Sequence, residues 1–103
     1  MQIYTNAQQT PLNFGMMRIR QIDGTTRRIE AKGGDTIWRI WGDVMKKGKC
    51  VETFNYENEK GFDEQDLAEI VESLCKNAKN KRNAINTTLA YLYANDHSVD
   101  YNA

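Results

Sequence analysis

The side chains that most often perform catalysis or hold metal ions are few and scattered in this chain. His97 is its one histidine, and it lies far from Cys50 and Cys75 in sequence. The two cysteines are too far apart for a redox CxxC pair, and the three residues have none of the short spacings of zinc ligands. We therefore expect no catalytic residue, no metal and no cofactor. His97 is expected to be solvated, and both cysteines to be buried thiols that act as small apolar side chains.

Two further patterns have a structural explanation. Acidic residues cluster between Asp63 and Glu72, but the segment lacks the glycine-centred loop of a calcium site, and a helix start with a solvated face explains it. Gly33 and Gly34 fit neither the dinucleotide-binding nor the P-loop glycine pattern. We expect them to be turn residues.

The charges of the chain come in blocks, although its net charge is zero. Lys and Arg outnumber Asp and Glu nine to four in residues 1–49; the counts are one to eight in residues 50–75 and four to two in residues 76–103. The blocks therefore carry +5, −7 and +2, which sum to zero. Such segregation predicts surfaces of opposite potential on one small body, and this favours electrostatically steered partners.

A β-hairpin is predicted around Asp23-Gly24, because alternating apolar and charged residues precede this turn signal. A three-residue loop over 22–24, with Gly24 left-handed, places Met17 opposite Ile29 and keeps the apolar side chains on one side of the sheet. The other side then carries a stripe of basic residues. This basic interaction face consists of Arg18, Arg20 and Arg28, extended by Arg27, Lys32 and Arg39.

The segment 36–47 supports two interpretations. Asp35 is a candidate N-cap, and apolar residues recur at helical spacing after it, which together predict an amphipathic helix. The apolar stripe of this helix consists of Ile37, Trp38, Ile40, Trp41, Val44 and Met45. A strand is the alternative, because the segment also alternates, Gly42 weakens a helix and Lys47-Gly48 suits a hairpin turn.

The second half of the chain predicts a strand followed by two helices. Residues 50–56 are rich in β-branched and aromatic side chains, which favours a strand. Asp63 then begins a helix with an acidic side, and a last helix is expected over 84–94. The acidic interaction face consists of Glu64, Asp66, Glu69 and Glu72. A second basic cluster, Lys76, Lys79, Lys81 and Arg82, lies between the two helices.

These elements predict an α+β fold, in which a small sheet made of the N-terminal hairpin and a third strand packs against helices in the order β-β-α-β-α-α. The hairpin, the helix entered through Asp35-Thr36-Ile37 and the returning strand resemble the opening of a ubiquitin-like β-grasp domain. The resemblance covers under half of the chain and rests on the order of elements. It implies no functional residue, although β-grasp domains include many binding modules.

One domain is expected over residues 16–95, preceded by a flexible arm (1–15) and followed by a frayed tail (96–103). No apolar run is long enough to cross a membrane, and the N-terminal residues have no signal-peptide pattern. We therefore expect a cytoplasmic protein without membrane contact.

The pattern as a whole favours binding over catalysis. The favoured hypothesis is a small non-catalytic protein–protein interaction module, an adaptor, regulator or inhibitor like many small proteins of phages and mobile elements, that docks through opposed basic and acidic faces. The alternative is a nucleic-acid-binding accessory or regulatory protein that uses the basic stripe or the second basic cluster. An isoelectric point near 6.6 counts against this alternative. Homo-oligomerisation stays open, and an enzyme with an unrecognised site is the least favoured reading.

Overall fold

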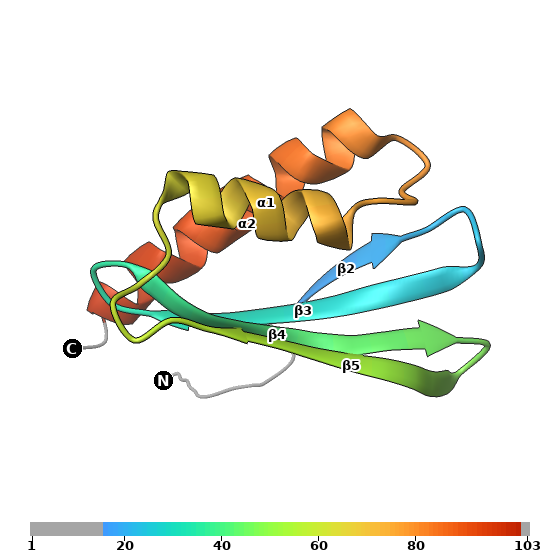
Figure 1. The fold of residues 1–103 in the computed structure, drawn as a ribbon, viewed down its shortest axis with the longest axis horizontal. Helices are drawn as coiled ribbons and strands as arrows, with labels where there is room; N and C mark the ends of the chain where they lie inside the picture. The colour runs from blue at the N-terminus through green and yellow to red at the C-terminus, as the bar shows by residue number, and fades with distance from the viewer. Residues whose placement is uncertain (1–15, 102–103) are drawn as a thin grey trace.

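The computed structural model describes residues 16–101, with side chains described for residues 16–94. Within this range, four antiparallel strands lie side by side in chain order: β2 (Met17–Arg20), β3 (Thr25–Gly33), β4 (Ile37–Lys46) and β5 (Lys49–Glu57). Two helices follow, α1 (Glu64–Leu74) and α2 (Lys81–Tyr101), and both lie on the same face of the sheet (Figure 1). The α+β class is confirmed. The order β-β-β-β-α-α differs from the predicted β-β-α-β-α-α.

Some predictions concern parts of the chain that lie outside the described residues. These are the arm (1–15), the last two residues of the tail and the side chain of His97. Neither described helix is long and apolar enough to cross a membrane.

The β2–β3 hairpin has the predicted register, with Met17 paired to Ile29. Its loop spans residues 22–24, because the N–H of Gln21 donates to the carbonyl oxygen of Thr25 at 2.9 Å. Gly24 has a φ of +84°, the left-handed conformation that this three-residue loop requires. Alternation along the strands then places the predicted stripe, Arg18, Arg20 and Arg28, on one face of the sheet.

The predicted helix over 36–47 is wrong, because this segment forms strand β4 between β3 and β5. The strands approach closely at Gly42, where a Cβ atom would lie 1.7 Å from the carbonyl oxygen of Arg28. Lys47 (φ 51°) and Gly48 (φ 80°) form the two-residue turn into β5. The alternative strand interpretation is therefore correct, and the order of a β-grasp domain, which needs a helix here, does not apply.

The remaining elements lie close to their predicted positions. β5 contains the strand predicted over 50–56. Asp63 caps α1 by accepting from the N–H of Asp66 at 2.8 Å, and the Asp66 carboxylate accepts in return from the N–H of Asp63 at 3.2 Å. α2 begins earlier than predicted, since Asn80 Oδ1 accepts from the N–H of Asn83 at 3.1 Å, and it continues to Tyr101. The predicted domain boundary at residue 95 falls inside this helix.

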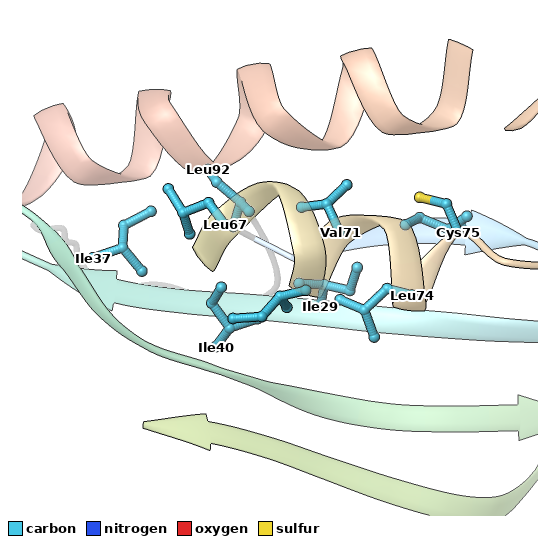
Figure 2. Close-up of a cluster of buried hydrophobic side chains, with 10 residues drawn as sticks. Ile29, Ile37, Ile40, Leu67, Val71, Leu74, Cys75 and Leu92 are labelled. Carbon is cyan, nitrogen blue, oxygen red and sulfur yellow. The ribbon is translucent and has the colours of Figure 1, made fainter. Parts of the chain in front are cut away.

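The core lies between the sheet and the two helices (Figure 2). Ile29 of β3 and Ile40 of β4 are fully buried there, as are Val71 of α1 and Leu92 of α2. The hydroxyl of Tyr91 also donates to the carbonyl oxygen of Ile29 at 3.3 Å, which ties α2 to the centre of the sheet. One face of the sheet thus packs against the core, and neither helix covers the other face.

Candidate functional site

The face of the sheet that neither helix covers is the candidate functional site (Figure 1). We call it the open sheet face. Strand pairing brings side chains from all four strands onto it: Arg18 lies opposite Arg28 and Arg28 opposite Asp43, which joins β2, β3 and β4. Asn55 of β5 lies opposite Trp41 of β4. Its members are Arg18, Arg20, Arg28, Glu30, Lys32, Trp38, Arg39, Trp41, Asp43, Asn55 and Glu57.

Two indole rings lie on this face under basic side chains. The guanidinium carbon of Arg39 lies 4.2 Å from the centroid of the Trp41 ring, and Lys32 Nζ lies 5.5 Å from the centroid of the Trp38 ring. Both distances fall within the range of cation–π attraction. Neither ring is among the described side chains that pack against the core. Both indoles are half-buried, and each has a basic side chain beside its ring.

Arg39 is fixed in place by a short polar network. Its Nε donates to Asn55 Oδ1 at 2.9 Å and lies 3.8 Å from Glu57 Oε2. Asn55 Nδ2 in turn donates to Glu57 Oε2 at 2.6 Å. The network is exposed and contributes little stability, but it orients the guanidinium over Trp41.

Arg28 makes a two-pronged ion pair with Asp43 across the β3–β4 ladder. Its Nε donates to Asp43 Oδ1 and its Nη2 to Asp43 Oδ2, both at 2.6 Å. These hydrogen bonds hold the pKa of Asp43 below its ordinary value and raise that of Arg28. Burial, with the negative charge of Asp43 as a second cause, raises the pKa of the neighbouring Glu30. The centre of the face is therefore an oriented, locally neutralised cluster.

The free positive charge lies at the edge of the face. Arg18 and Arg20 are exposed, and no carboxylate of the described residues forms an ion pair with either. The predicted extension to Arg27 does not belong here, because Arg27 pairs with Ile19 and Val44 and so points to the helix side. The sequence placed it in the stripe from its charge alone.

The acidic interaction face lies on α1 and is separate from the open sheet face. Glu64 and Glu69 are exposed, whereas Asp66 is used in the cap of α1. Glu72 Oε2 lies 3.4 Å from Lys81 Nζ. Among the described residues, that is the one ion pair between the acidic face and a predicted basic cluster, so the stripe arginines are not neutralised by α1.

The second basic cluster is divided by the structure. Lys81 and Arg82 begin α2, and Lys76 is exposed after α1. Lys79 instead lines a groove together with Arg18 and Arg20 of the hairpin. Residues that the sequence assigned to two clusters thus meet at the edge strand β2.

The sequence missed the two indoles and Asp43 as site residues. The cause was the helix predicted over 36–47, which assigned Trp38 and Trp41 to a buried stripe. The alternation of Arg39, Trp41 and Asp43, all on one face, was the available signal. It became usable only with the strand interpretation.

The prediction that both cysteines are buried is correct for Cys75 and wrong for Cys50. Cys75 is buried, and burial raises the pKa of its thiol. Cys50 is exposed, contrary to expectation, because it follows the β4–β5 turn. Among the described residues, no group of three His, Cys, Asp or Glu side chains is arranged to hold a metal ion.

Comparisons with known proteins add no family to this description. No protein-family model matches the chain, and no match is found among curated proteins or solved structures.

Proposed function

We propose that this protein is a small non-catalytic protein–protein interaction module that docks on an acidic partner protein through the open sheet face. One observation carries the proposal: two indole rings and a surplus of cations share a face that neither helix covers. Tryptophan and arginine are enriched among the residues that dominate binding energy at protein interfaces. A surface of this kind suits an adaptor, regulator or inhibitor.

The charge of the face supports an acidic partner. Arg28 and Arg39 are oriented by their carboxylate neighbours, while Arg18 and Arg20 have no such neighbour among the described residues. The oriented guanidiniums supply specific donors, and the unpaired ones supply long-range attraction. Attraction of this kind speeds the encounter with an acidic surface and disfavours basic ones.

The acidic side of α1 is a second docking surface in this proposal. α1 lies on the face of the sheet opposite to the open sheet face, so the acidic interaction face is separate from the indole-bearing one. A module with opposed basic and acidic faces can bridge two partner surfaces of opposite charge.

Binding of single-stranded nucleic acid is the second candidate. The observation that favours it is the same pair of indoles on an antiparallel sheet, since bases stack on exposed aromatic rings in a sequence-tolerant way. It ranks lower because the chain has a net charge of zero and an isoelectric point near 6.6, whereas nucleic-acid-binding domains usually carry an excess of basic residues.

Affinity capture with matched variants tests the proposal. The tagged full-length protein is exposed to nuclease-treated extract of its source cells, and the retained proteins are identified and purified. We expect one defined acidic protein whose affinity falls at least about 30-fold with Trp41→Ala, the usual cost of removing a tryptophan anchor. Higher salt should weaken the same complex, because attraction between exposed charges is screened.

Two controls make the result specific. Lys60→Glu changes an exposed charge in the loop between β5 and α1, and should leave capture intact. Glu69→Lys combined with Glu72→Lys tests the acidic face separately. Equal capture by the Trp41→Ala variant would contradict docking on the open sheet face, and capture that disappears after nuclease treatment would favour the nucleic-acid candidate.

A further inference from the structure

Among the described residues, β2 is an edge strand of the sheet, and half of its main-chain groups do not bond to β3. The N–H of Gln21 bonds to Thr25 across the hairpin, so Ile19, two residues earlier, also faces β3. Arg18 and Arg20 alternate with these two residues along the strand. Their N–H and C=O groups therefore point away from β3, toward the sheet edge. An edge of this kind can accept a further strand.

The connection between α1 and α2 already pairs with this edge, just after the C-terminal end of β2. The N–H of Ile22 donates to the carbonyl oxygen of Asn77 at 2.8 Å, and Gln21 forms an antiparallel bridge with Ala78. The connection between α1 and α2 then turns away into α2. The length of β2 from Met17 to Arg20 is left next to a groove.

The groove combines an apolar floor with basic walls. It has a volume of about 240 Å³ and runs between β2 and the start of α2. Met17, Ile19 and Ala84 contribute apolar surface, and Lys79 joins the two edge arginines. None of the described residues that line the groove carries a carboxylate.

This chemistry identifies the occupant. We propose that an extended acidic peptide segment of a partner protein binds here as an added strand antiparallel to β2, with apolar side chains in the groove and carboxylates beside Lys79, Arg18 and Arg20. Main-chain hydrogen bonds supply the pairing, and alternate side chains of the peptide supply the specificity. The site is distinct from the indole-bearing part of the open sheet face, and its test does not depend on docking there.

Charge argues against the other occupants of this edge. Two copies of the chain paired through β2 would place their edge arginines beside one another, which is destabilising. Residues 1–15 contain no Asp or Glu and so cannot complement the basic walls. The opposite edge strand, β5, carries Glu52 and Glu57 and an irregular register next to Val44, features that discourage strand addition.

A synthetic peptide tests the proposal on the full-length protein. The probe is a fluorescent eight-residue peptide that alternates glutamate and valine, and its counterpart alternates lysine and valine. We expect the glutamate peptide to bind and the lysine peptide not to bind. Lys79→Glu should weaken binding at least tenfold, whereas Lys46→Glu, an exposed charge change at the end of β4, should not.

The main-chain part of the proposal needs a separate pair of variants. Arg18→Ala removes the charge and keeps the outward N–H, and Arg18→Pro removes both. Arg18→Pro should therefore weaken binding more than Arg18→Ala does. In hydrogen exchange, the glutamate peptide should protect the amides of Arg18 and Arg20, while the Ile19 amide, which is already bonded to β3, should change little.

Several results would overturn the proposal. Equal binding of both peptides, or no added protection at Arg18 and Arg20, would remove strand addition. Binding that appears only after deletion of residues 1–15 would assign the groove to the chain's own N-terminal segment. Protection of the same amides by a short oligothymidylate in place of the peptide would assign it to nucleic acid.

Discussion

Protonation of Asp43 should make the stability of the open sheet face depend on pH. It accepts both hydrogen bonds from Arg28, and this contact depresses its pKa. A carboxylate with a depressed folded-state pKa contributes stability above its unfolded pKa, and that contribution is lost as the pH falls through the folded value. Glu30 acts in the opposite direction, because its raised pKa makes folding more favourable at acid pH.

Asp43→Asn should therefore change the pH dependence of stability. We expect the variant to be less stable than the wild-type chain at pH 7, and the difference to shrink as the pH falls from the ordinary pKa of an aspartate through the depressed pKa of Asp43. Urea unfolding of both proteins between pH 2.5 and 7 measures this. Asp35→Asn, in the exposed β3–β4 turn, is the control and should give a difference that is small at every pH. A gap for Asp43→Asn that is constant across the range would contradict the ion-pair explanation.

The stripe of arginines could be predicted at this scale because hairpin registers are local. Turn length and apolar alternation fixed which hairpin residues face together, and Arg18, Arg20 and Arg28 lie as expected. The partners of the stripe could not be predicted in the same way. Asp43 lies fifteen residues beyond Arg28, and the contact exists only once β4 is a strand.

At the scale of elements, an irregularity in the pairing of β4 explains why the sequence of this strand has the apolar spacing of a helix. The buried residues Ile37, Ile40 and Val44 have the spacing i, i+3, i+7 that is typical of a helical face. In the structure, a register shift between Lys32 and Gly33 brings both Ile37 and Ile40 toward the core. The irregularity thus produces helical spacing in a strand, and periodicity alone cannot separate the two. α1 was predictable because its cap and its apolar face are local signals.

Gly42→Ala distinguishes the two structures of this segment by the sign of its effect. In an exposed helix the change would stabilise by up to about 1 kcal/mol, because alanine is the better helix former. In β4 the new Cβ would lie 1.7 Å from the Arg28 carbonyl oxygen and 2.8 Å from the Phe54 ring. We expect destabilisation of about 3 kcal/mol, at the upper end of the usual cost of overpacking, measured by urea unfolding.

Gly34→Ala is the matched control for this change. A Cβ at Gly34 would meet nothing within 4 Å, and its φ is not in the left-handed region. The control should change stability by less than about 0.5 kcal/mol, because the added methyl group meets no neighbour. If Gly42→Ala were as mild as the control, the close strand packing described here would be wrong.

At the scale of the whole molecule, the four described strands are followed by two helices that both cover the same face of the sheet. Both helices follow the sheet in sequence and pack on one side, where α2 lies against β3 and α1 against α2. The charge blocks of the sequence follow this division, because the basic hairpin contributes to the sheet and the acidic block extends from β5 into α1. Charge segregation along the chain therefore becomes charge segregation in space, with Arg28 neutralised inside the sheet and not by α1.

The sheet and the two helices share one core, so they should unfold together. Leu92 of α2 is fully buried against the cluster that contains Ile29 and Ile40, and Leu92→Ala should lower the free energy of unfolding by about 2–5 kcal/mol. Tryptophan fluorescence reports on the sheet, because Trp38 and Trp41 both belong to β4, and circular dichroism at 222 nm is dominated by the helices. We expect the two signals to give the same midpoint in wild type and variant.

Tyr93→Ala is the control. Tyr93 is the next residue on α2 and is 41% exposed, so its removal should change stability little. Loss of the helical signal before the fluorescence change would mean that the sheet stands without α2, contrary to a single core.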